Sequence, residues 1–104
     1  MGKKKDLERL SAMAVQVADI YAERFGALRD SGWLLHKLSE ELGEVTGAWL
    51  QATGRGRGAA SPQDVADECA DVLGFLLVFA AREGIDVGEA LWQKWGKYLP
   101  EEPE

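Results

Sequence analysis

The sequence contains one cysteine and one histidine among its 104 residues. Cys69 alone cannot form an internal disulfide, which favours a reducing, cytoplasmic compartment. A helix through this part of the chain would place Cys69 on its apolar side, as a small core residue. His36 alone cannot supply the two Glu-x-x-His pairs of a di-iron carboxylate bundle. Zinc and copper sites also depend on histidine or cysteine ligands. We therefore expect neither a disulfide scaffold nor these classes of metal site.

Positive charge and long apolar runs are also scarce. Lys and Arg total 12 against 18 Asp and Glu, which gives a net charge of −6. Nucleic-acid-binding proteins neutralise phosphates with Lys and Arg, so no polymeric nucleic acid is expected as a partner. The uncharged, apolar run at residues 72–81 is too short to span a bilayer. The basic start, residues 1–6, leads into a charged segment and does not read as a signal peptide. No membrane partner is expected.

Apolar residues recur at helical spacing along the chain, and no stretch shows the alternation of a strand. In the first stripe, Leu7, Leu10, Ala14, Val17 and Tyr21 follow one another three or four residues apart. The pattern predicts an all-α, four-helix bundle formed by a single domain, residues 1–104. The four helices are expected at about residues 5–25, 33–53, 62–83 and 87–98, with a frayed tail at 100–104.

Turn and cap residues mark the ends of these helices. Residues 30–32, Asp-Ser-Gly, suit the start of the second helix, and the glycine-rich residues 54–58 end it. Ser61-Pro62 is a start signal for the third helix, which should stop before Gly84. Asp86 and Glu89 have the spacing of a capping box for the fourth.

Two acidic steps mark the second and third predicted helices. Glu40-Glu41 is followed by Glu44, and Glu68 is followed by Asp71. Residues three apart on a helix lie about 60° apart around its axis, so each step places two carboxylates on one face. Packed antiparallel, the two helices would gather four carboxylates, which repel unless a multivalent cation lies between them. We expect inward-facing, metal-binding carboxylates, although a charge run alone would indicate a solvated face.

The surroundings of the acidic steps favour this interpretation. Residues 73–81 are uncharged on every side, which predicts that this half of the helix is surrounded by protein. Too few Lys and Arg lie nearby to pair every carboxylate. Ligands that are all oxygen favour Mg²⁺, with Mn²⁺ as a substitute. A calcium loop is not indicated, because the acids lie on helix faces.

The order of the acids resembles a known signature. Glu40-Glu41-x-x-Glu44, then residues 45–67, then Glu68-x-x-Asp71 is similar to the EExxE…ExxD pattern of the MazG-like, all-α NTP pyrophosphohydrolase superfamily. The context agrees over about residues 31–99: Lys37-Leu38 precedes the first half, Asp71-Val72-Leu73 extends the second, and Gly84-Ile85-Asp86 opens the last helix. Each half alone is weak, and the two together make a strong signal.

The resemblance implies Mg²⁺-dependent cleavage of a nucleoside triphosphate between its α- and β-phosphates, giving monophosphate and pyrophosphate, in a nucleotide-pool or house-cleaning role. It implies Glu41, Glu44, Glu68 and Asp71 as metal ligands. Glu41 would help to deprotonate the attacking water, and Glu40 would orient water or support the site. Bound metal would offset the negative charge of the triphosphate, which otherwise repels the nucleophile.

The resemblance also implies substrate contacts and an oligomer. The candidate phosphate or substrate contacts are Lys37, Lys94, Lys97, Arg55 and, as a base-stacking residue, Trp33. A homodimer or homotetramer is implied, and the extensive apolar surface of the predicted third helix independently favours one. Two alternatives stay open. One is a related hydrolase of dUTP or phosphoribosyl-ATP, and the other is a non-catalytic nucleotide- or metal-sensing dimerisation module.

Overall fold

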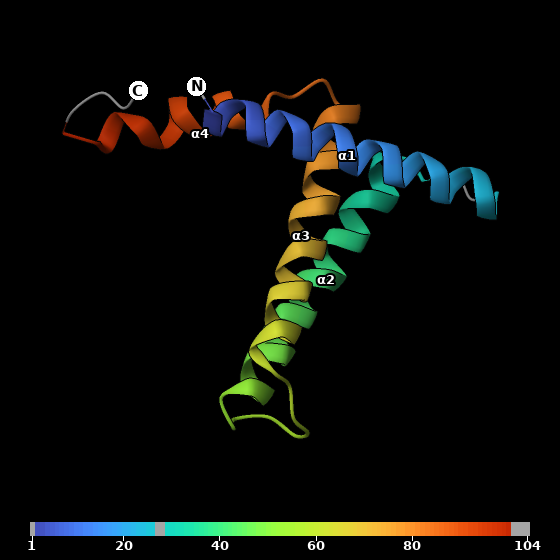
Figure 1. The fold of residues 1–104 in the computed structure, drawn as a ribbon, viewed down its shortest axis with the longest axis vertical. Coiled ribbons are helices and arrows are strands. Elements are labelled where there is room, and N and C mark those ends of the chain that lie inside the picture. Colours follow the sequence, from blue (N-terminus) through green and yellow to red (C-terminus); the bar gives the residue numbers. More distant parts are fainter. Residues whose placement is uncertain (1, 27–28, 101–104) are drawn as a thin grey trace. The chain divides into compact units, whose positions relative to one another are not determined.

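The protein is described by a computed structural model that covers residues 2–26 and 29–100, with side chains from residue 6 onward. Four α-helices occur in this part of the chain (Figure 1). They are α1 (Gly2–Phe25), α2 (Ser31–Ala52), α3 (Pro62–Arg82) and α4 (Val87–Trp95), and a 3₁₀ turn, η1 (Gly96–Tyr98), follows α4. No strand occurs among the described residues, which confirms the all-α fold class. The predicted frayed tail lies outside the described residues from 101 onward.

The helix ends lie within three residues of the sequence-based boundaries, and three of the eight ends coincide with them. The second helix begins at Ser31 rather than Trp33, because the Asp30 side chain accepts a hydrogen bond from the Trp33 backbone N–H at 2.9 Å. The fourth α-helix ends at Trp95, and the residues predicted to extend it form η1 instead. Such differences are usual at frayed helix ends.

Side-chain caps fix the boundaries of α3 and α4. The Asp64 N–H donates to the Ser61 hydroxyl at 3.1 Å, and the Ser61 N–H donates to the Asp64 carboxylate at 2.8 Å. This is a reciprocal capping box with Asp in the place of Glu. Helix α3 ends before Gly84, whose φ of +68° lies in the left-handed region that glycine adopts without strain. Asp86 then caps α4 by accepting from the Glu89 N–H at 3.0 Å.

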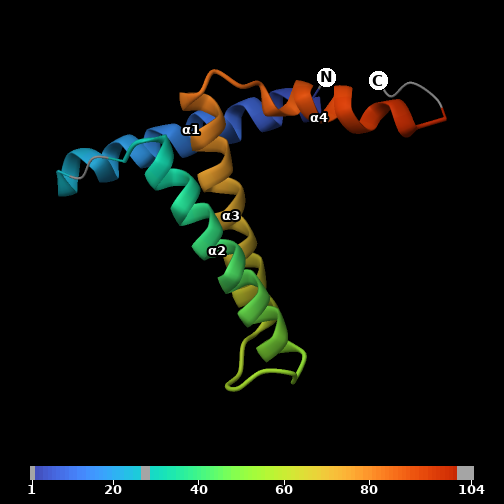
Figure 2. The same ribbon diagram turned by 180° about the vertical axis from the view of Figure 1, so that it is seen from behind.

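The described chain forms two compact units. Leu28–Leu76 forms the first, which we call the hairpin unit: α2 and the larger part of α3 run antiparallel, joined by residues 53–61 (Figures 1 and 2). Its buried residues include Leu34 and Glu41. The Trp33 and Phe75 rings meet edge to face, with centroids 6.0 Å apart, and tie the two helices together. The hairpin unit contains both acidic steps.

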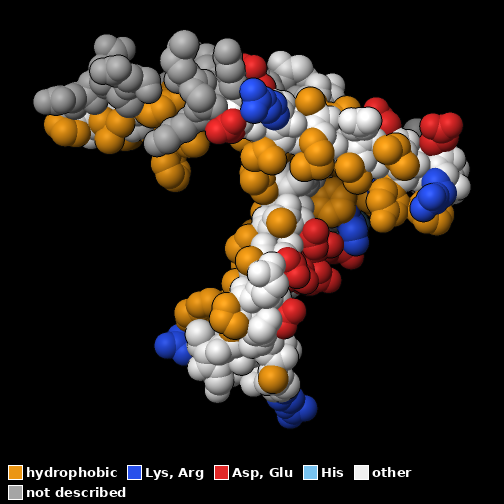
Figure 3. Space-filling model, viewed as in Figure 1, with side chains coloured by type: hydrophobic (Ala, Val, Ile, Leu, Met, Phe, Trp, Pro, Cys, Tyr) orange, Lys and Arg blue, Asp and Glu red, His pale blue; other side chains and the backbone are white. Residues whose placement is uncertain are grey.

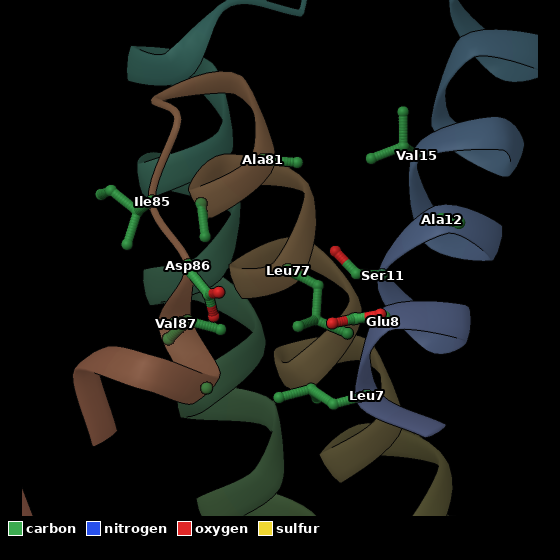
Figure 4. A pocket seen from close by; sticks show the side chains of 12 residues that line it. Leu7, Glu8, Ser11, Ala12, Val15, Leu77, Ala81, Ile85, Asp86 and Val87 are labelled. Carbon is green, nitrogen blue, oxygen red and sulfur yellow. The ribbon is translucent and has the colours of Figure 1, made fainter. Parts of the chain in front are cut away.

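The second unit combines Met1–Ala27 with Leu77–Glu104, and we call it the α1–α4 unit. An ion pair at 3.5 Å joins Arg82, at the end of α3, to Asp19 of α1. Helix α4 begins close to α1: a Cβ added at Gly88 would lie 3.0 Å from Leu7 Cδ2. A cavity of 490 Å³ lies between α1, the end of α3 and the start of α4 (Figure 4). It is lined mainly by apolar side chains, among them Leu7, Val15, Leu77 and Ile85.

Two expectations about the third helix are corrected. Leu77, Val78 and Ala80 are buried, but Leu73 is 44% exposed, so residues 73–81 are not covered on every side by their own chain. Cys69, which its position on the helical wheel suggested to be a small core residue, is exposed. Both residues lie on a helix face that the described part of the chain leaves uncovered.

None of the described helices combines the length and apolarity needed to cross a membrane.

Candidate metal centre

The candidate site is a cluster of three carboxylates in the hairpin unit, formed by Glu41 and Glu44 of α2 and Glu68 of α3. One carboxylate oxygen from each residue lies within 4.8 Å of the other two. The capped, antiparallel helices bring these residues together although residues 45–67 separate them along the chain. We call them the acidic cluster; Figure 3 shows acidic side chains gathered on the hairpin.

The three members of the acidic cluster differ in exposure. Glu41 is buried, with 6% of its surface exposed, whereas Glu68 is half-buried and Glu44 is exposed. The cluster is therefore closed on the Glu41 side and open to solvent on the Glu44 side. The exposed Glu44 side gives a small cation access to the cluster.

Two carboxylate oxygens of the cluster are buried without a hydrogen-bond partner: Oε2 of Glu41 and Oε2 of Glu68. A buried acceptor that no donor satisfies is destabilising, and native proteins contain few of them. A cation bound in the cluster would give these two carboxylates the positive partner that the described residues do not supply. The donor set, three carboxylates with no sulfur or imidazole, suits the hard divalent ions Mg²⁺ and Mn²⁺. The residues present therefore fit the ion that the sequence suggested.

The electrostatics of Glu41 agree with this arrangement. The pKa of Glu41 is raised above its usual 4.5, first because a protonated Glu41 can hydrogen-bond to the Glu44 side chain. Burial and the negative charge of Glu44 raise this pKa further, while the Lys37 ammonium lowers it. The neighbouring carboxylate and burial thus make ionisation of Glu41 costly, and a bound cation would lower that cost.

Asp71 and Glu40 lie outside the acidic cluster. Asp71 is exposed on α3, one turn after Glu68, and is not among the residues whose oxygens converge. Glu40 is at the edge of the site: its side chain is 51% exposed, and its Oε1 lies 3.7 Å from Lys37 Nζ. Asp71 as a ligand and Glu40 as a water-orienting group stay predictions.

The predicted substrate contacts are spread over both units. Lys37, in the hairpin unit, contacts the acidic residues themselves. The Trp33 ring meets Phe75 at its edge and has the Arg29 guanidinium 4.6 Å from its centroid.

The Arg55 guanidinium lies over the Trp49 ring at 5.0 Å, so the glycine-rich loop holds it against α2. Lys94 and Lys97 are exposed in the α1–α4 unit, where Lys97 Nζ lies 5.3 Å from the Tyr98 ring centroid. The roles of all these candidates in binding phosphate or substrate stay predictions.

Sequence reasoning missed the contacts of Lys37, which it treated only as a candidate for binding phosphate. The signal was present, because Lys37 lies three and four residues before Glu40 and Glu41, where helical side chains meet.

Comparison with protein families agrees with this picture. Residues 9–94 match the model of the family described as phosphoribosyl-ATP pyrophosphohydrolase. The chain belongs to this family. Phosphoribosyl-ATP pyrophosphohydrolases are part of the MazG-like, all-α superfamily, so the resemblance is confirmed at that level, and the match does not bear on the individual motif residues. The family consists of hydrolases of phosphoric anhydrides, which supports a pyrophosphohydrolase activity. Comparison with characterised proteins and with solved structures gave no significant match.

Proposed function

We propose that this protein hydrolyses the anhydride bond between the α- and β-phosphates of phosphoribosyl-ATP, releasing pyrophosphate and leaving a monophosphate. The family to which residues 9–94 belong supports the reaction class and favours this substrate. The observation that carries the chemistry is the acidic cluster with its two unsatisfied buried oxygens. Hydrolysis of a canonical or modified nucleoside triphosphate, including dUTP, is the second candidate. The motif of Glu40, Glu41, Glu44, Glu68 and Asp71 favours it, and it would correspond to a house-cleaning role.

The residues of the hairpin unit would have different roles in binding the ion and activating water. Glu41, Glu44 and Glu68 would hold Mg²⁺ or Mn²⁺. Asp71, one turn further along α3, is the candidate for a fourth ligand. When bound, the ion supplies positive charge that offsets the charge of the phosphate oxygens. Glu40, half exposed beside the cluster, would orient the attacking water, and Glu41 would help to deprotonate it. The closed Glu41 side limits access of bulk water, and the open Glu44 side receives the triphosphate.

We propose a homodimer or homotetramer as the working form, located in the cytoplasm. Leu35, Leu42 and Trp49 are spaced by seven residues on α2, and each is at least 45% exposed. A repeat of this spacing forms one stripe along a helix and favours pairing with another helix. A second copy of the chain presents the same stripe, so the surface is self-complementary under two-fold symmetry. The single cysteine favours a reducing compartment.

The test is pyrophosphate release from phosphoribosyl-ATP and from a panel of NTPs, dNTPs and dUTP, with Mg²⁺ and then with EDTA. We expect Mg²⁺-dependent release of pyrophosphate with the matching monophosphate, and the highest kcat/KM for phosphoribosyl-ATP. A higher kcat/KM for another nucleotide would show that phosphoribosyl-ATP is not the preferred substrate, while the proposed pyrophosphohydrolase reaction would still hold. No release from any nucleotide would favour the non-catalytic sensing module.

A further inference from the structure

Lys37 occupies a specific place in the acidic cluster. Its Nζ lies 3.6 Å from Glu41 Oε1 and 3.7 Å from Glu40 Oε1. Both distances exceed those of ordinary hydrogen bonds, so the contacts act through charge. The Lys37 side chain is 35% exposed, between the buried Glu41 and the half-exposed Glu40. The ammonium therefore lies at the boundary between the closed part of the site and solvent.

The two oxygens of Glu41 have different surroundings. Oε1 faces the Lys37 ammonium, whereas Oε2 is buried without a hydrogen-bond partner. Glu41 also belongs to the three residues whose oxygens converge. One carboxylate group is thus shared between a cation that the chain supplies and the position where an external cation fits.

We propose that Lys37 is a resident counter-ion that competes with the divalent cation for Glu41 and so sets the ion concentration at which the site fills. This inference rests on the metal site of the proposed function and adds its regulation. Without the ion, Lys37 partly neutralises Glu41. When the ion binds, Glu41 is released from the pair, and Glu40 keeps the ammonium at the solvent edge.

The proposal makes a prediction of definite sign. An ammonium and a divalent ion on the same carboxylate repel each other, and the effect is larger near a buried group than in water. Removing the ammonium should therefore strengthen ion binding. If Lys37 only oriented Glu41 for the ion, removing it would weaken binding, because the ligand would lose its fixed position. The two roles predict opposite changes in the dissociation constant.

The experiment is a titration of the full chain with Mn²⁺, without nucleotide, in which free Mn²⁺ is followed by its electron paramagnetic resonance signal. Lys37→Met removes the charge and keeps the length of the side chain, and Lys37→Arg keeps the charge. Arg57→Met is the matched control, since it changes net charge by the same amount in the exposed loop of the hairpin unit. We expect Lys37→Met to bind Mn²⁺ roughly tenfold more tightly than the parent chain. Arg57→Met and Lys37→Arg should stay within about twofold.

Other outcomes overturn the proposal in distinguishable ways. If Lys37→Met binds Mn²⁺ as tightly as the parent chain does, or more weakly, Lys37 is not a competing counter-ion. Binding of Mn²⁺ by the parent chain would still support the metal site itself. If neither the parent nor any variant binds Mn²⁺, the metal site and the counter-ion role both fail. Lys37→Gln provides the same test should Lys37→Met not fold, as judged by its circular dichroism.

Discussion

The substitution Glu41→Gln should stabilise the metal-free protein and weaken its response to Mg²⁺. In the metal-free state Glu41 is 6% exposed, and its Oε2 has no hydrogen-bond partner. An unsatisfied buried acceptor of this kind costs about 1–3 kcal/mol of folding free energy. The substitution puts an amide NH₂ in the place of this oxygen, and the amide can donate to the Glu44 carboxylate beside it. The substitution also gives up the ion pair with the partly exposed Lys37, which is worth under about 1 kcal/mol. The net expectation is a gain of about 1 kcal/mol, or about 4 °C in Tm.

The response to Mg²⁺ should change in the opposite direction. An ion at 100 times its dissociation constant stabilises the parent chain by about 2.7 kcal/mol, or roughly 10 °C. Losing even a group that supports a metal ligand weakens binding about 10- to 100-fold, and Glu41 is itself a member of the cluster. With binding weakened roughly 100-fold, the same Mg²⁺ concentration gives only about 0.4 kcal/mol.

Differential scanning calorimetry in EDTA and in MgCl₂, at one fixed protein concentration, measures both effects. Glu40→Gln is the matched control, because Glu40 is the neighbouring carboxylate but is half exposed. Its metal-free stability should change by no more than about 0.5 kcal/mol. A Glu41→Gln protein that is less stable than the parent in EDTA, or that keeps the full Mg²⁺ shift, would refute the reasoning.

Two further predictions concern pH and assembly. Since the folded-state pKa of Glu41 is raised above 4.5, its contribution to metal-free stability is fully present below about pH 4.5 and is lost as pH rises through the folded pKa. Urea unfolding in EDTA at several pH values should show the parent losing stability relative to Glu41→Gln as pH rises, and a gap that is constant with pH would contradict this. Leu42→Glu places a charge on the exposed α2 stripe, where Leu42 is 58% exposed, and should raise the dissociation constant of the oligomer at least tenfold in sedimentation equilibrium. An unchanged mass distribution would exclude this stripe from the interface.

Helix positions and caps could be predicted well from the sequence, because they depend on local chemistry. Asp30, Ser61 and Asp86 each bond a free N–H within three residues, so neighbouring residues contain the whole signal. Gly84 ends α3 for a similarly local reason. The match of residues 9–94 to an all-α family agrees with this outcome.

The candidate site could be predicted only in part. Spacing placed Glu41 and Glu44 on one face of α2, but which residue of α3 faces them depends on the rotation and register of two packed helices. The structure brings Glu68 into the cluster and leaves Asp71 exposed. The exposure of individual side chains could not be predicted from the sequence either, as Cys69 and Leu73 show. Whether a helix face is covered depends on what packs against it.

The connection between α2 and α3 has a consequence for how this protein can diversify. All three residues of the acidic cluster come from the hairpin unit, within one continuous stretch of chain. Insertions or substitutions in α1, α4 and η1 therefore leave the set of charged oxygens unchanged. A lineage can therefore alter the α1–α4 unit without replacing any carboxylate of the acidic cluster. Relatives of this chain can then keep the acidic cluster while the sequences of their α1–α4 units diverge.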